Sequence, residues 1–161
     1  MLFRSLNAYL KQNSPYPIFN YSEIRPLGTP IKTFGGTAAG HEPLEKLHKH
    51  IDKLFKGRAG EKVTRRDIAD IGNLIGVCVV SGNVRRSAEL LIGRIDDEEF
   101  LNLKNPERFP ERNSYDPQAP GWGWMSNNSV EVSVGQDLDA IVDGIARNGE
   151  PGVIWLDVSR Q

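Results

Sequence analysis

A loop rich in glycine and proline, about residues 25–40, carries two cationic side chains, Arg25 and Lys32. It includes Gly35 and Gly36 and leads into a segment with helical periodicity. Glycine lets backbone N–H groups approach an anion closely, and the aligned peptide dipoles of a helix N-terminus favour negative charge. This arrangement favours binding of a nucleoside triphosphate. The spacing matches neither the P-loop nor the dinucleotide fingerprint, so an ordinary surface loop is the alternative.

Two adjacent arginines, Arg85 and Arg86, lie between a glycine turn at Ser81 and Gly82 and an apolar run at residues 88–92. A guanidinium keeps its proton, so arginines that enter a packed segment need carboxylate, phosphate or carbonyl partners. One interpretation is a helix-to-strand corner whose arginines bind backbone carbonyls or acidic neighbours. The other places the corner beside a substrate, with Ser81 and nearby amides as hydrogen-bond donors, because ligands gather at strand ends in α/β folds.

Amide and hydroxyl side chains follow one another at Asn127, Asn128 and Ser129, just before a predicted buried strand. Side chains of these types can hydrogen-bond the hydroxyls of a ribose. The tryptophans that precede them, Trp122 and Trp124, are consistent with a second interpretation, a surface segment whose aromatic rings pack under a loop. Both interpretations remain open at this point.

The remaining polar residues predict no catalytic group and no metal ligand. Cys78 lies on the apolar stripe of a predicted helix, where a cysteine usually behaves as a small hydrophobe. His48 and His50 are two residues apart on a predicted helix, so their side chains point away from each other and are expected to be solvated. No arrangement of serine, histidine and aspartate, and no pair of carboxylates, stands out as a catalytic motif.

Two amphipathic helices are expected before the arginine pair. The first begins at Glu42, ends before Gly57, and carries an apolar stripe at helical spacing. The second follows Thr64 and Asp67, which resemble a capping box. The apolar positions that define the two stripes are Leu44, Leu47, Ile51, Leu54 and Phe55 in the first, and Ile68, Ile71, Leu74, Ile75 and Cys78 in the second.

Strands and helices then alternate to the end of the chain. We expect strands at residues 88–92, 130–134 and 153–156, helices at 96–104 and 138–148, and a polar loop with four prolines at 106–123. Helical connections between strands favour a parallel sheet, and the first strand reads as covered on both faces. Three strands leave hydrogen-bonding edges exposed, so the pattern predicts an α/β fold that is a piece of a larger barrel.

Composition limits the class of protein that the chain can form. Apolar content of 39% and charged content of 25% are ordinary for a soluble globular domain, and a formal net charge of −1 gives no general attraction to nucleic acid or membranes. The single cysteine excludes an internal disulfide and favours the reducing cytoplasm. Residues 1–17 have no secretion signal and are expected to be a poorly ordered leader ahead of a domain at 18–161.

The segments 24–40, 78–93, 124–130 and 148–157 occur in the same order as similar segments of ribonucleotide reductases. The chain resembles an internal fragment of the catalytic chain of the adenosylcobalamin-dependent, class II, ribonucleoside-triphosphate reductases. The resemblance covers about residues 18–157. It implies a partial reductase-type α/β barrel with alternating helices and mostly parallel strands.

In that family a loop like residues 25–40 is the specificity loop, which reports a bound deoxynucleotide effector to the substrate base. The resemblance therefore places Arg25, Lys32, Gly35 and Gly36 near the effector or the base. It places Ser81, Gly82, Asn127, Asn128 and Ser129 near the ribonucleoside triphosphate substrate. It also implies adenosylcobalamin as the cofactor of the complete enzyme, and the remainder of the reductase chain or a complementing subunit as partner, with neither nucleic acid nor a membrane.

The family's radical-bearing cysteine lies in an Asn-Pro-Cys-Gly-Glu motif, which these 161 residues do not contain. The isolated chain is therefore expected to have no reductase activity, since no other residue can start the radical chemistry. Two alternatives remain: a non-catalytic nucleotide-binding or regulatory module, and a fragment of the large subunit of a diiron-dependent reductase.

Overall fold

The computed structural model describes residues 2–33, 35–82 and 87–159, and the side chains from Ser5 onward within them. Contacts divide the chain into two compact units. Unit 1 comprises Met1–Thr64 and Leu74–Ser87, and unit 2 comprises Arg65–Asn73 and Ala88–Gln161. Helix α3, Arg65–Val80, contributes its first half to unit 2 and its second half to unit 1.

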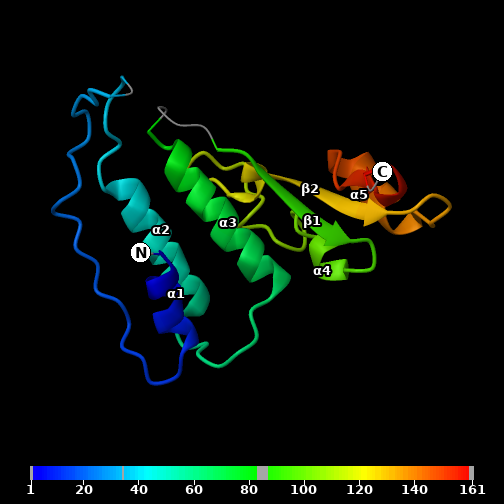
Figure 1. Ribbon diagram of the computed structural model, residues 1–161, viewed down its shortest axis with the longest axis horizontal. Coiled ribbons are helices and arrows are strands. Elements are labelled where there is room, and N and C mark those ends of the chain that lie inside the picture. The colour runs from blue at the N-terminus through cyan, green and yellow to red at the C-terminus, as the bar shows by residue number, and fades with distance from the viewer. Residues whose placement is uncertain (1, 34, 83–86, 160–161) are drawn as a thin grey trace. The chain divides into compact units, whose positions relative to one another are not determined.

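Helix α2, Glu42–Phe55, is the main helix of unit 1 and confirms the first predicted helix (Figure 1). A proline in its first turn fits the helix start, where a missing N–H group costs nothing. Lys56 caps the end of the helix, and Gly57 follows with a φ of +86°, a conformation that favours glycine. Its buried face carries Leu47, His48, Ile51 and Phe55.

Aromatic side chains from the N-terminal segment pack on α2. Helix α1, Leu2–Leu10, contributes Tyr9, which is only 2% exposed and donates a hydrogen bond to Asp52. Burial, together with the Asp52 carboxylate, raises the pKa of Tyr9 to about 12. Residues 1–17, expected to be a poorly ordered leader, thus include a helix that packs in unit 1, and the domain division at residue 17 stays a prediction.

His48 lies in an aromatic cluster of unit 1. Its ring stacks on Phe19 at 3.6 Å between centroids, and its Nδ1 atom is 2.9 Å from the hydroxyl of Tyr21. The residue is buried, and burial lowers the pKa of His48 below its ordinary value. The neutral imidazole is therefore the form that the folded protein favours.

We expect the free energy of unfolding to fall as the pH drops below about 6.5, the ordinary pKa of histidine. In that range the unfolded chain takes up a proton at His48 that the folded chain resists, so protonation favours unfolding. Urea unfolding at a series of pH values from 5 to 8 measures the effect. In H48Q the pH dependence should flatten, whereas H50Q should keep it; an unchanged pH profile in H48Q would contradict the assignment.

Unit 2 contains a sheet of three parallel strands in the order β1, β2, β3 (Figure 1). The strands are β1, Glu89–Arg94; β2, Ser126–Val132; and β3, Gly152–Trp155. They are connected through α4, Glu98–Leu101, the 3₁₀ turn Gly123–Met125, and α5, Asp139–Asn148, while α6, Leu156–Ser159, follows β3. The predicted parallel α/β arrangement is confirmed, with an open sheet and not a closed barrel.

One face of the sheet is buried against helices. Val130 and Val132 of β2 are fully buried there, with Ala69 of α3, Phe100 of α4 and Ile141 of α5. The opposite face, here called the open face, is not covered within unit 2. Leu90 and Ile92 of β1 are 57% and 52% exposed on it, so the prediction that this strand is covered on both faces is wrong for the described chain.

The second predicted helix is confirmed as α3, but its inward face differs from the predicted stripe. Ile68 is 61% exposed, while Asp67, Asp70 and Asn73 are buried in unit 2. The reason is a partner far along the chain: Arg112, fully buried, donates hydrogen bonds to Asp70 and Asn73. A buried arginine needs such polar partners, and they fix which face of the helix turns inward.

Two further elements differ from expectation in length. The helix expected at residues 96–104 is the shorter α4. The Asp97 side chain accepts a hydrogen bond from the Phe100 N–H and caps its start, and Asn102 caps its end. The strand expected at 130–134 begins earlier and ends at Val132, and Val134 lies outside it with 75% of its surface exposed. No helix among the residues that the structure describes is long and apolar enough to cross a lipid bilayer.

Candidate functional site

The glycine-rich loop of unit 1 forms a small hairpin. Thr37 pairs with Pro30 in an antiparallel bridge, and backbone hydrogen bonds join Gly28 to Ala38 and Ile31 to Gly36. Gly35 and Gly36 have φ values of +70° and +78°, which favour glycine. A Cβ atom added at Gly35 would meet no atom within 4 Å, so the space beside this glycine is open.

The cationic residues of the hairpin are exposed. Arg25 and Lys32 both lie on the surface of unit 1, as do Gly35 and Gly36. Several N–H groups that were expected to cradle an anion instead donate within the hairpin, among them that of Gly35, which bonds the Ile31 carbonyl. The cations, with the open space beside the glycines, are therefore what the hairpin offers an anionic ligand.

The N-terminus of α2 adds little to anion binding. Glu42 and Glu45 occupy its first turn, and their carboxylates already interact with the positive end of the helix dipole. A lysine one turn later, Lys49, pairs with Glu45 at 2.6 Å. The sequence-based expectation of a helix terminus that attracts phosphate is therefore weakened by the acidic residues that the same helix carries.

The turn at Ser81 and Gly82 lies beside the base of the hairpin. A Cβ atom added at Gly82 would lie 3.4 Å from the Cβ atom of Ala39, so the two segments are in contact within unit 1. The Ser81 hydroxyl donates to the Cys78 carbonyl at 2.7 Å. Its proton is thus engaged at the end of α3, and its oxygen remains as an acceptor. Arg85 and Arg86 lie outside the described residues.

The three polar residues at the start of β2 do not point the same way, because successive strand residues face opposite sides of a sheet. Asn127 is exposed and lies on the open face, with Ser129 two residues later on the same side. Asn128 is 4% exposed on the buried face, where its side chain accepts a hydrogen bond from the Ser126 hydroxyl. Asn127 and Ser129 are therefore available to a ligand, and Asn128 supports the strand.

The same strand is held by a charged pair that sequence reasoning missed. The Nζ atom of Lys104 donates to the Ser126 carbonyl at 2.6 Å, and the Glu150 carboxylate accepts the N–H of Asn128 at 3.1 Å. The sequence placed Lys104 only as the last residue of the helix expected at 96–104. The one signal in the sequence was a charged residue next to a proline before a buried strand, Glu150 before Pro151, and it is too common to be specific.

A second cluster in unit 2 was also missed. The buried Asp70 carboxylate accepts hydrogen bonds from Arg112, from the Trp122 indole at 2.6 Å, and from Arg66 at 3.3 Å. Asn73 bridges this cluster to Glu89 of β1 at 2.8 Å. Because burial removes water from the guanidinium, it lowers the pKa of Arg112, and the Asp70 charge opposes that shift. The cluster anchors the proline-containing loop that leads to β2.

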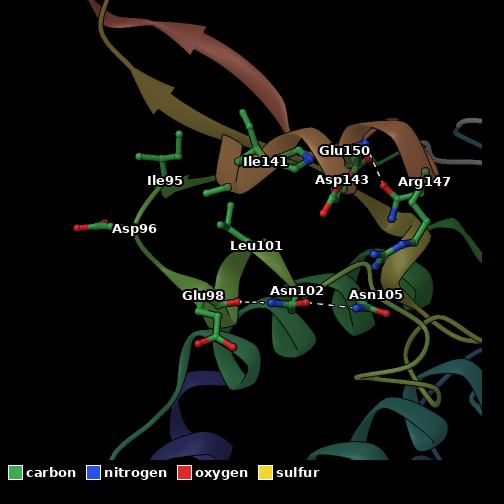
Figure 2. Close-up of a pocket in the computed structure, with 14 residues that line it drawn as sticks. Ile95, Asp96, Glu98, Leu101, Asn102, Asn105, Ile141, Asp143, Arg147 and Glu150 are labelled. Atoms are coloured by element: carbon green, nitrogen blue, oxygen red, sulfur yellow. Dashed lines mark hydrogen bonds between the residues drawn. The ribbon is translucent and has the colours of Figure 1, made fainter. Parts of the chain in front are cut away.

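A cavity of about 450 Å³ lies between α4 and α5 in unit 2 (Figure 2). Its walls carry one cation, Arg147, together with asparagines and apolar residues such as Leu101 and Ile141. The four carboxylates that line it belong to Asp96, Glu98, Asp143 and Glu150. Their charge opposes a phosphate, so a triphosphate is better matched by the exposed cations of the hairpin than by this cavity.

The surroundings of Cys78 and of the histidines indicate no catalytic or metal-binding role. Cys78 is half-buried on α3, and burial raises the pKa of its thiol, which disfavours the reactive thiolate. His50 bonds the Lys46 carbonyl through Nδ1 at 2.9 Å, and His41 lies 3.6 Å from Glu45. In residues 2–33, 35–82 and 87–159, no three His, Cys, Asp or Glu side chains gather as metal ligands would.

Comparison with known proteins finds relatives that match most of this chain. No family model matches the chain. It is 49% identical over 138 residues to the adenosylcobalamin-dependent ribonucleoside-triphosphate reductase of Euglena gracilis, and 43% identical over 145 residues to that of Lacticaseibacillus paracasei. These matches cover 86% and 89% of the chain. The chain is similar to one segment of the adenosylcobalamin-dependent ribonucleoside-triphosphate reductases.

A solved structure agrees with these sequence matches. The crystal structure of a B12-dependent, class II, ribonucleotide reductase matches the chain with a TM-score of 0.66 and 39% identity, over 84% of this chain and 17% of that one. The chain spans 18% of the length of the two curated reductases named above. The three parallel strands with their helices thus match part of the reductase fold, as the order of the sequence motifs predicted.

The relatives are named for adenosylcobalamin, and the described residues can be tested against that cofactor. The cavity between α4 and α5 has a volume typical of sites for drug-sized ligands, and a corrin ring with its side chains is bulkier. The residues that line this cavity include no histidine or cysteine that could approach a cobalt ion. This cavity does not fit the cofactor, and we derive no chemical step through it.

Proposed function

We propose that this chain forms part of a ribonucleotide reductase that converts ribonucleoside triphosphates to deoxyribonucleotides by radical chemistry, with adenosylcobalamin as the radical source. The observation that carries the proposal is identity of 43% and 49%, over most of the chain, to reductases named for that substrate class and cofactor. The diiron-dependent large subunit, the other reductase type considered, has no comparable support from these relatives. A cytoplasmic setting remains a prediction from the single cysteine.

The hairpin of unit 1 is proposed as the effector specificity loop, about residues 25–40. Arg25 and Lys32 would pair with the phosphates of a deoxynucleotide, since both cations are exposed. Gly35 and Gly36 would let the effector or the substrate base come close to the backbone, because the left-handed conformation there excludes most side chains.

The proposed substrate contacts come from two segments. Asn127 and Ser129 present amide and hydroxyl groups on the open face of the sheet, where they can hydrogen-bond ribose hydroxyls. Ser81 and Gly82 are proposed to meet the substrate near the base of the hairpin, with the Ser81 oxygen as an acceptor. Asn128 belongs to the same proposed site as a supporting residue, because its side chain lies on the buried face.

The isolated chain is proposed to be inactive and to need the remainder of a reductase chain or a complementing subunit. Cys78 is its single cysteine and lies outside any Asn-Pro-Cys-Gly-Glu motif. Its raised thiol pKa and its helical position do not suit a reacting thiol. The proposed division of the chain places the catalytic segment at residues 18–161.

A chimeric reductase tests the proposed function. The matching segment of the Lacticaseibacillus paracasei enzyme is replaced by residues 18–157 of this chain, and formation of deoxyribonucleotide from each ribonucleoside triphosphate is measured with adenosylcobalamin present. We expect the chimera to be active and the isolated chain to form no product. A chimera that folds but forms no product, together with an isolated chain that binds deoxynucleotide tightly, would favour the non-catalytic module.

Charge removal in the hairpin tests the effector site in the same chimera. R25A with K32A should weaken the binding of the deoxynucleotide effector by at least about tenfold, because charge-assisted hydrogen bonds to its phosphates are lost. Equilibrium dialysis with a labelled deoxynucleotide measures this. The matched control is K62A, which removes an exposed lysine of unit 1 outside the hairpin and should leave the affinity unchanged. Equal affinities in all three proteins would rule out the hairpin as the effector site.

A further inference from the structure

Strand β2 begins before its neighbour β3 does. In the parallel register Ser129 pairs with Gly152, the first residue of β3, so Ser126, Asn127 and Asn128 extend past the start of that strand. On the side of β1 the same residues are paired, from Glu89 with Ser126 onward. The first residues of β2 therefore lack backbone partners from β3, and among them are the proposed substrate contacts.

Two side chains take the place of those backbone partners. The Glu150 carboxylate accepts the Asn128 N–H at 3.1 Å, and the Lys104 ammonium donates to the Ser126 carbonyl at 2.6 Å. The N–H and C=O groups of residues two apart in a strand point to the same side, so one charged pair can serve both. Lys104 and Glu150 also approach each other, with 3.4 Å between Nζ and Oε2. The pair thus replaces the backbone hydrogen bonds that β3 does not provide at this end of β2.

The charged pair is itself held in place. The side chains of Lys104 and Glu150 are only 16% and 21% exposed. The Asn148 side chain donates to the Lys104 carbonyl at 3.2 Å and accepts the Glu150 N–H at 3.0 Å. Both backbones are therefore tied to one asparagine at the end of α5. This rigidity separates the pair from a surface ion pair, whose two long side chains move freely.

The geometry points to Lys104 and Glu150 as positioning residues for Asn127. By fixing the backbone on each side of it, at the Ser126 carbonyl and the Asn128 N–H, the pair sets the direction in which the Asn127 amide leaves the open face. This inference rests on the proposed function, because it is the ribose of a ribonucleoside triphosphate that Asn127 is proposed to contact. Neither residue touches the ligand; both act through the backbone of β2.

The variant K104M removes the donor to Ser126 and keeps most of the side-chain volume. Titration of the whole 161-residue chain with a ribonucleoside triphosphate, followed by NMR at the Asn127 side-chain amide, gives the substrate affinity. We expect K104M to weaken it about tenfold, the scale of one lost charge-assisted hydrogen bond, while deoxynucleotide binding at the hairpin is unchanged. E150Q keeps an acceptor for the Asn128 N–H, so it should lose less substrate affinity than K104M. Wild-type substrate affinity in a folded K104M chain would overturn the inference.

The matched control is R108M, which removes a cation four residues away whose partner, Glu98, is 76% exposed. It should leave both affinities unchanged, since exposed pairs of this kind contribute little. If the wild-type chain shows no ribonucleotide contact at Asn127, the proposed substrate site fails separately. The positioning role is then read from amide hydrogen exchange: K104M should speed exchange at Asn128 about tenfold but not at Val132. Unchanged exchange at Asn128 would overturn the positioning role itself.

Discussion

R112M should lower the free energy of unfolding by about 4 kcal/mol, within the range for breaking a buried ion pair. Arg112 is fully buried, and its guanidinium donates to Asp70 and Asn73. Methionine nearly fills the space but leaves the Asp70 carboxylate buried with the Trp122 indole and Arg66 as its remaining donors. Urea denaturation followed by tryptophan fluorescence measures the change, and the Trp122 environment should report it directly.

Two further variants separate the buried charge from simple loss of volume. R94M removes one partner of an ion pair whose side chains are 78% and 65% exposed, and it should cost less than about 1 kcal/mol. The double variant D70L with R112M no longer contains the uncompensated charge. Its loss in free energy of unfolding should therefore be smaller than the sum of the losses of the two single variants. Additive losses would show that Asp70 and Arg112 do not act as a pair.

G121A should destabilise the protein by about 3 kcal/mol, the upper part of the range for overpacking. A Cβ atom at Gly121 would lie 2.3 Å from the carbonyl oxygen of Arg112 and 2.6 Å from the backbone nitrogen of Ser114. These are backbone atoms, so no side chain can rotate away to make room. The loop that carries Arg112 would have to move, and thermal unfolding should show a lower midpoint.

The matched control for Gly121 is another loop glycine of unit 2. Gly135 has a φ of +83° and no atom within 4 Å of an added Cβ, so G135A should cost only about 1 kcal/mol from the left-handed backbone. A loss of stability in G121A no larger than in G135A would mean that the loop at Gly121 adjusts freely.

Periodicity was enough to predict α2, α3 and the parallel sheet, although not α1 or the open face of the sheet. The spacing of Leu47, Ile51 and Phe55 predicts α2 because a local repeat of 3.6 residues carries the whole signal. The alternation of helices and strands likewise predicts the parallel sheet. Such features depend on near neighbours in the chain, and the sequence contains them directly.

The orientation of α3 could not be predicted in the same way. Ile68 belonged to the most apolar stripe, yet it is exposed, and the polar Asp70 and Asn73 turn inward. Their partner, Arg112, lies 42 residues beyond Asp70. No local pattern links two such positions, and a charged residue inside a helix is more often on the solvent side.

The candidate site was predicted by residue type more than by geometry. Asn127, Asn128 and Ser129 were taken together because they are adjacent in sequence, but the start of β2 at Ser126 puts them on alternating faces. The exact first residue of a strand is the least predictable part of it. Lys104 and Glu150 escaped notice because their partners are backbone atoms, which leave no trace in residue identity.

The alternation along β2 has an evolutionary consequence. A substitution at Asn127 changes only what the open face presents, whereas a substitution at Asn128 disturbs a buried contact with Ser126. Ligand preference can therefore drift at every second position of this strand without disturbing the scaffold. If Asn127 contacts the substrate as proposed, adjacent codons are expected to be under different kinds of selection, one for recognition and the next for architecture.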